Sequence, residues 1–150
     1  MSDVVLDASV LVAALSPREV HHALASELYH SHPESRPFLV PSLFRVEVIS
    51  ALARRGERDE FLGTMDALVS GPRFHSVELG DRLLERATEV ARKAKLRAYD
   101  AVYVALSLAR GATLFTLDTE VSSRALRAFP KARILPSPER RPSRGRSRSR

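Results

Sequence analysis

The sequence predicts an α/β fold in which helices connect the strands of a parallel sheet. Short apolar runs rich in β-branched residues alternate with longer segments of helical periodicity, which is the pattern of βαβ units. The chain has 150 residues, of which 44% are apolar and 28% are charged. A globular domain of this size buries most of its apolar surface in one core, so we expect a single domain.

Five strands are expected, and two of them are marked clearly because an aspartate follows closely. The first strand runs directly into Asp7, and the fourth is followed by Leu117 and Asp118. Each run is short and apolar, as is usual for buried strands of a parallel sheet. The predicted strands are Val4–Leu6, Phe38–Val40, Phe74–Leu79, Thr113–Thr116 and Arg133–Leu135.

Helical periodicity fills the segments between these strands. A short helix after Asp7 is expected to stop near Pro17, and a second helix to start at about Val20. Further helices are predicted over Leu43–Arg54 and Phe61–Val69. After a cap at Asp81, one apolar stripe of a helix is predicted to contain Leu83, Leu84, Ala87, Val90, Ala91 and Ala94.

The segment Asp100–Arg110 differs from the other helices because apolar residues surround almost its whole circumference. A helix that is apolar on all sides is buried on all sides. We therefore predict a central helix that ends at Gly111.

The composition excludes several classes of protein. Apolar runs stay far below the roughly 20 residues that cross a bilayer, and no basic segment precedes the first apolar run. The chain has no cysteine, which excludes disulfides and zinc–thiolate sites. We expect a soluble protein, with the cytoplasm as its default location and no membrane contact.

The basic charge of the chain is concentrated at its end. The formal net charge is +6, and residues 139–150 supply +5 of it through six arginines and one glutamate. We therefore expect residues 1–136 to form the domain and 137–150 to form a disordered basic tail. The tail either attaches RNA electrostatically or is only a solvated terminus. Its candidate RNA-binding residues are Arg140, Arg141, Arg144, Arg146, Arg148 and Arg150.

Asp7 and Asp118 follow two different strands of the predicted sheet. Ligands bind beyond the carboxyl ends of the strands in open α/β sheets, so both carboxylates are expected to face one crevice. An aspartate between a strand and a helix is also a favoured N-cap, which explains either residue taken alone. Asp100 meets the same objection, but it opens the most apolar helix and is expected to be carried inward.

Glu47 is not explained by capping. It shares a helical row with Leu43 and Ala51 and is flanked by Val46 and Val48, on what we take to be an apolar face. A carboxylate on such a face costs several kcal/mol of desolvation unless it is neutral, paired or bound to a metal. Glu47 is therefore a candidate ligand together with Asp7, Asp100 and Asp118.

Four converging carboxylates require a cation among them. Two unit charges about 4 Å apart repel by roughly 4 kcal/mol at an effective dielectric constant near 20. An all-oxygen site suits Mg²⁺ or Mn²⁺, which can activate a water molecule for hydrolysis of a phosphodiester. Ser9 and Thr116 lie two residues from Asp7 and Asp118 and are candidates for hydrogen bonds to a carboxylate, water or phosphate, although such residues also cap helices.

The order and spacing of these motifs resemble the PIN-domain family, and most closely its VapC-type toxins. The resemblance spans roughly residues 3–136. It rests on Val5-Leu6-Asp7-Ala8-Ser9, on Glu47 within Glu-Val-Ile-Ser-Ala-Leu, on Tyr99-Asp100-Ala101-Val102-Tyr103, and on Thr116-Leu117-Asp118.

The resemblance implies a three-layer α/β/α domain with Mg²⁺- or Mn²⁺-dependent endoribonuclease activity. It also implies a homodimer and a small antitoxin partner. Asp7, Glu47, Asp100 and Asp118 match the four acidic positions of the family. Members of the family often carry a further aspartate where this chain has Glu120, whose longer side chain suggests an outer role.

Two other functions remain open from the sequence. One is a PIN-fold nuclease that processes RNA without an antitoxin, and the other is a non-catalytic RNA-binding module. Clustered negative charge opposes a purely binding role, because it repels phosphates. Phosphatases of the haloacid dehalogenase kind are excluded because they need an aspartate where Ser9 stands, and phospho-receiver domains because the early acidic pair is missing.

Overall fold

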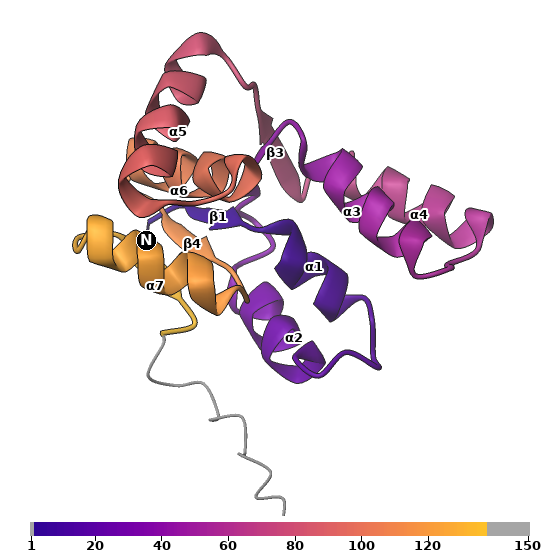
Figure 1. Cartoon of the computed structure of the whole chain (residues 1–150). Helices are drawn as coiled ribbons and strands as arrows, with labels where there is room; N and C mark the ends of the chain where they lie inside the picture. The colour runs from indigo at the N-terminus through magenta and orange to yellow at the C-terminus, as the bar shows by residue number, and fades with distance from the viewer. Residues whose placement is uncertain (1, 138–150) are drawn as a thin grey trace, which may run out of the picture.

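A computed structural model describes residues 2–137 as a parallel sheet surrounded by helices (Figure 1). The strands are β1 (Val4–Leu6), β2 (Phe38–Pro41), β3 (Phe74–Val77), β4 (Thr113–Phe115) and β5 (Arg133–Leu135). They are all parallel and lie in the order β3-β2-β1-β4-β5. The predicted five-stranded parallel sheet is therefore confirmed.

The order of the strands reverses between β1 and β4. Val4 pairs with Thr113 and Leu6 pairs with Phe115, so the two strands end level with each other. From β1 the chain continues outward to β2, whereas from β4 it continues in the other direction to β5. The connections that leave β1 and β4 consequently diverge, and they leave a crevice at the carboxyl ends of these strands.

Helices cover both faces of the sheet. In Figure 1, α5 and α6 lie on one side of β1, and α1 and α2 lie on the other, which confirms the three-layer arrangement. α3 packs against α1 and α4, and α7 packs against α5. The helices are α1 (Ala8–Ala14), α2 (His22–Ser31), α3 (Phe44–Arg54), α4 (Asp59–Val69), α5 (Asp81–Ala94), α6 (Ala98–Arg110) and α7 (Thr119–Ala128).

α6 is the central helix that the sequence predicts. Its residues 101–107 are all buried, because the helix packs against β1, β2 and β4 on one side and against α5 on the other. Gly111 caps it in the left-handed region with φ of 58°, which glycine adopts without steric cost. The burial of this helix carries its first turn, with Asp100, toward the carboxyl edge of the sheet.

Two expectations for helix ends are wrong. α2 begins at His22, and Val20 is 90% exposed in the preceding turn, where the Glu19 amide donates to the Ser16 carbonyl. The N-cap of α5 is Gly80, so Asp81 is its first helical residue and provides no side-chain cap. A carboxylate in the first turn still interacts favourably with the helix dipole, which explains why the sequence pattern alone does not separate these positions.

Two expectations for side-chain burial are also wrong. Leu84 is 43% exposed and lies outside the buried stripe of α5, and Val46 beside Glu47 is 69% exposed. His32 is buried against the ring of Phe38. The guanidinium of Arg73 covers the same ring and donates to four backbone carbonyls, three in the loop between α2 and β2 and one, that of Tyr29, in α2.

Two strands end earlier than the sequence predicts. β3 ends at Val77, two residues before the predicted end, and β4 ends at Phe115, because Thr116 already belongs to the turn that leads to α7.

No helix within residues 2–137 combines the length and apolar character that crossing a membrane requires. The predicted tail arginines from Arg140 onward lie outside the described residues.

Candidate active site

One crevice of about 390 Å³ is lined by all four predicted carboxylates, Asp7, Glu47, Asp100 and Asp118. Asp7 follows β1 and Asp118 comes shortly after β4, on the two sides of the point where the strand order reverses. Glu47 reaches the crevice from the first turn of α3, and Asp100 from the first turn of α6. We call this space the carboxylate crevice.

Asp7 is the most buried of the four, with 8% of its surface exposed. Its Oδ2 accepts hydrogen bonds from the Thr116 hydroxyl at 2.7 Å and from the Ser9 hydroxyl at 3.1 Å. Burial raises the pKa of Asp7, while these hydrogen bonds and the Ser9 amide lower it. Thr116 and Ser9 therefore fix the orientation of the carboxylate and partly offset its desolvation.

Asp118 has a double position. Its Oδ1 accepts from the amides of Glu120 and Val121 at 2.9 and 3.1 Å, which caps α7. The Asp118 amide donates to the Thr116 hydroxyl at 3.2 Å, so Thr116 joins Asp118 to Asp7. The capping interpretation is thus correct for Asp118, and the side chain nevertheless lines the carboxylate crevice.

Glu47 is half-buried and hydrogen-bonded to a residue that sequence reasoning did not select. The Tyr103 hydroxyl donates to Glu47 Oε1 at 2.8 Å. The pKa of Glu47 is raised from 4.5 to about 7, mainly by burial and also by the charges of Asp7 and Asp100, while the bond from Tyr103 acts to lower it. Tyr103 lies one helical turn after Asp100, so the i, i+3 spacing is a signal that points to it.

Asp100 is half-buried at the edge of the crevice. Its pKa is raised from 3.8 to about 6, mainly by burial and also by the charges of Asp7 and Asp118, while Arg97 acts to lower it. The negative charge of at least one other carboxylate of the set therefore opposes the ionisation of Asp7, of Glu47 and of Asp100.

The donor set of this crevice fits a hard divalent cation. Its lining offers several carboxylate oxygens, one imidazole from His21 and no sulfur, and this predominance of oxygen suits Mg²⁺ or Mn²⁺ better than zinc. Within residues 2–137, no three histidine, aspartate or glutamate side chains lie close enough together to coordinate a metal ion as they stand. This separation agrees with the mutual repulsion that raises the pKa values of Glu47 and Asp100.

Glu120, which we expect in an outer role, is exposed on α7. It forms an ion pair with Arg124, and it lines the depression beside the carboxylate crevice together with Asp100 and Asp118. Its charge contributes to the raised pKa of Asp100. These contacts place Glu120 next to the four carboxylates.

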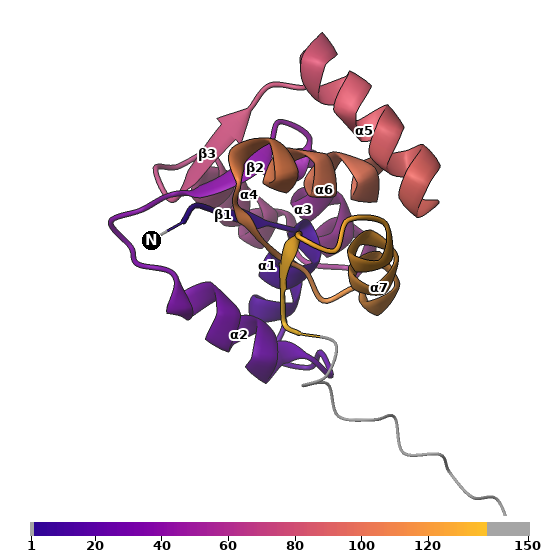
Figure 2. The same ribbon diagram turned by 90° about the vertical axis from the view of Figure 1, so that its left-hand side faces the viewer.

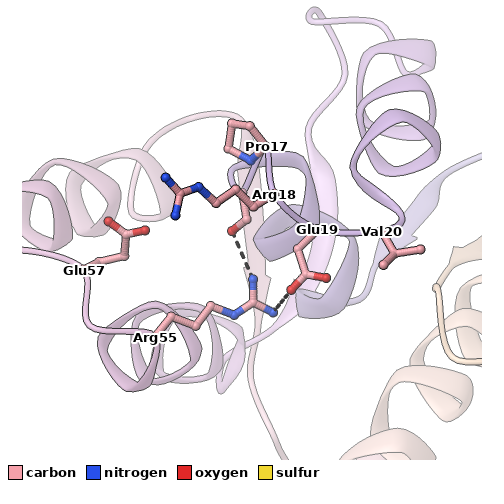
Figure 3. Close-up of a pocket in the computed structure, with 7 residues that line it drawn as sticks. Pro17, Arg18, Glu19, Val20, Arg55 and Glu57 are labelled. Carbon is pink, nitrogen blue, oxygen red and sulfur yellow. Dashed lines mark hydrogen bonds and ion pairs between the residues drawn. The ribbon is translucent and has the colours of Figure 1, made fainter.

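A larger depression of about 580 Å³ adjoins the carboxylate crevice on the side of Glu19 and Arg55 (Figure 3). Arg55 and Glu19 line both spaces. Figure 3 shows Arg55 pointing from the end of α3 to Glu19, with which it forms an ion pair, and it also donates to the Ser16 hydroxyl. Arg55 thus joins α3 to the loop before α2. The larger depression lacks Asp7, Glu47, Asp100 and Asp118, so the carboxylate crevice is the candidate active site.

Tyr103→Phe is expected to lower metal affinity or the rate of cleavage by about 10–100-fold, because it removes the hydrogen bond that orients Glu47. Isothermal titration with Mn²⁺ and single-turnover cleavage measure the two effects. Tyr99→Phe is the matched control, since Tyr99 lies on the same helix and is 62% exposed. Equal metal affinity and rate in both variants contradict a positioning role for Tyr103.

An open parallel α/β sheet with acidic side chains at its strand-order reversal defines a class of ligand-binding and catalytic proteins. Comparison with known proteins gives the family within this class. A family model described as the PIN domain matches residues 4–126, and the chain belongs to the PIN-domain family. Ribonuclease VapC9 from Mycobacterium tuberculosis is 36% identical over 126 residues, which cover 79% of this chain and 88% of the relative. The chain therefore groups with the VapC ribonucleases, as the motifs predict.

Solved structures agree with this assignment at the level of the fold. The crystal structure of VapC20 from Mycobacterium tuberculosis, a toxin that cleaves the sarcin–ricin loop, superimposes with a TM-score of 0.68 at 19% identity. It covers 81% of this chain and 94% of its own. A toxin–antitoxin complex from Klebsiella pneumoniae gives a TM-score of 0.68 at 17% identity, and covers 91% of this chain and 98% of its own.

Proposed function

We propose that this VapC-type protein is a Mg²⁺- or Mn²⁺-dependent endoribonuclease and the toxin of a type II toxin–antitoxin pair. One observation carries the proposal. Four carboxylates from four separate segments line the same crevice, and three of them have pKa values raised by burial and by one another. Such a crevice holds a divalent cation more favourably than it holds four bare charges.

Asp7, Glu47, Asp100 and Asp118 would hold the cation. A divalent ion bound there supplies a water molecule of lowered pKa and stabilises the negative charge that develops on the phosphodiester. Thr116 and Ser9 keep Asp7 oriented, and Tyr103 keeps Glu47 oriented. Glu47 or Asp100 would also accept a proton through a water molecule.

The test is a cleavage assay with the full chain. Purified protein is incubated with total RNA in the presence of Mn²⁺, of Mg²⁺ or of EDTA, and the new RNA ends are mapped by sequencing. We expect internal cuts that require the metal. Cleavage that persists in EDTA and in the Glu47→Gln variant contradicts the metal site, and absence of cleavage by freshly purified monomeric and dimeric fractions contradicts the nuclease.

The antitoxin is proposed from the comparisons, and the homodimer only from the resemblance to VapC-type toxins. VapC-type relatives are ribonucleases by name, and a toxin–antitoxin complex shares the fold. We expect a neighbouring gene to encode a small protein that copurifies with this chain and blocks RNA cleavage. We also expect light scattering to give twice the chain mass of 16.7 kDa for the isolated protein. A mass of one chain contradicts the homodimer.

A further inference from the structure

Basic side chains continue from the carboxylate crevice along the boundary between α5 and α7. A depression of about 340 Å³ is lined by Asp100 and Asp118 of the crevice and also by Lys95, Arg97 and Arg124. Lys95 and Arg124 then line a second depression of about 380 Å³ together with Lys93 and Arg127. Because neighbouring spaces share residues, they form one path, which we call the α5–α7 groove.

The tertiary structure, and not the local sequence, brings these cations together. The end of α5 and the middle of α7 lie side by side (Figure 2), where the Arg124 guanidinium donates to the Lys95 carbonyl at 2.6 Å. Lys95 ends α5 in the left-handed region, with φ of 54°. This backbone conformation is unfavourable for any residue other than glycine. A lysine at this position therefore lowers the stability of the fold.

Three of the five cations that line the α5–α7 groove form no ion pair among the described residues. Within residues 2–137, the side chains of Lys95, Arg97 and Arg127 take part in no ion pair. Arg124 is shared with Glu120, and Lys93 with Glu89. Residues 1–138 carry a net charge of only +1, obtained by subtracting the +5 of residues 139–150 from +6. A run of cations beside the acidic crevice is therefore a local feature and not the average of the surface.

The opposite end of the crevice offers less free charge. Arg55 is paired there with Glu19, and Glu57 lines the same depression as Arg18. A polyanion that places one phosphodiester among four carboxylates needs cations for its neighbouring phosphates. A narrow groove that follows a backbone with cations is the usual way in which proteins hold a single strand.

We propose that the α5–α7 groove binds the phosphates of single-stranded RNA on one side of the bond that is cut. Lys95, Arg97, Arg124 and Arg127 contact successive phosphates and place the strand across Asp100 and Asp118. The inference rests on the proposed endoribonuclease function, and it adds the path of the substrate to that function.

RNA binding tests the groove independently of cleavage. The Asp7→Asn background holds RNA uncut, and the groove variant adds Lys95→Gln and Arg127→Gln to it. The matched control adds Arg82→Gln and Arg86→Gln, which remove two charges from a separate depression on α5. The probe is a fluorescein-labelled single-stranded RNA of mixed sequence, and anisotropy is measured over a range of salt concentrations.

The groove variant is expected to bind about 10-fold more weakly at 0.1 M salt, with a slope of log affinity against log salt that is smaller by about 1.4, because two phosphate contacts are lost. The control is expected to change less than about 2-fold. Shortening the RNA from one end alone then weakens binding by the background protein, and it has no further effect on the groove variant. Equal loss in both variants overturns the proposal and attributes the effect to overall charge.

The result also separates the groove from the nuclease. If the protein cuts RNA but binds it equally well with and without the groove cations, the proposed role of the groove is refuted and the nuclease is not. An acidic polypeptide is then the candidate ligand of the groove. A protein that loses RNA affinity in the groove variant but never cuts RNA refutes the nuclease and supports the groove as a binding surface.

Discussion

Replacing Asp7 with asparagine is expected to abolish RNA cleavage while the protein stays folded. Asp7 lies at the centre of the site, because it receives hydrogen bonds from Thr116 and Ser9 and its charge acts on both Glu47 and Asp100. Loss of one such charge at a reacting centre typically lowers the rate by about 10²–10³-fold or more. Asparagine has the same shape, so the packing around the side chain is retained.

Asp7→Asn is expected to abolish cleavage without lowering the stability of the metal-free protein. Without metal, Asp7→Asn removes a buried negative charge that other carboxylates oppose, so its free energy of unfolding is expected to equal or exceed that of the wild type. With Mn²⁺, only the wild type gains stability, because a ligand that binds the native state raises the unfolding free energy. Thermal unfolding with Mn²⁺ and with EDTA measures both effects.

Asp66→Asn is the control for this experiment. Asp66 is an exposed carboxylate that pairs with Arg45 outside the carboxylate crevice. Its loss is expected to leave cleavage and the Mn²⁺ effect unchanged. Asp100→Asn is expected to behave as Asp7→Asn does. Metal-dependent cleavage that survives in Asp7→Asn or in Asp100→Asn removes that residue from the set of ligands.

Metal affinity is expected to fall by about 10²–10³-fold between pH 8 and pH 5, because the ligands must be deprotonated to bind. Glu47 has a pKa of about 7 and Asp100 a pKa of about 6, so both take up protons within this range. The change is much larger than for ordinary carboxyl groups, which are still mostly ionised at pH 5. Isothermal titration with Mn²⁺ at four pH values measures it.

The stability of the metal-free protein is expected to rise as the pH falls, whereas its metal affinity decreases. The pKa values of Glu47 and Asp100 are higher in the folded state than the ordinary values of 4.5 and 3.8, so the native state holds these protons more tightly. The stability that they contribute is present below about pH 4 and is lost as the pH rises to about 7. After allowance for solvent screening, the total loss is about 2 kcal/mol.

Chemical unfolding in EDTA from pH 4 to pH 8 measures this loss. Other groups also titrate in this range, so the comparison with Glu47→Gln isolates one carboxyl group. The variant is expected to lose less stability over the interval than the wild type does, since glutamine does not ionise. Identical pH profiles for the two proteins contradict the raised pKa of Glu47.

Much of the architecture follows from local patterns. β1 and β5 begin and end where the sequence predicts, and α6 is buried on all sides because apolar residues surround it. The patterns fail where two neighbouring residues have equal apolar character. Leu83 and Leu84 both suit the apolar stripe of α5, and only the position of α5 against α6 decides that Leu83 is buried and Leu84 exposed.

The sequence by itself determined the βαβ alternation and the placement of Asp7 and Asp118 just after two strands, because period and punctuation are local properties of a chain. Only the tertiary structure decided which groups meet. The bond from Thr116 to Asp7 joins residues 109 positions apart, and that from Tyr103 to Glu47 joins residues 56 apart. Such contacts, like the pairing of α5 with α7 in the basic groove, depend on packing between distant segments, which no local periodicity encodes.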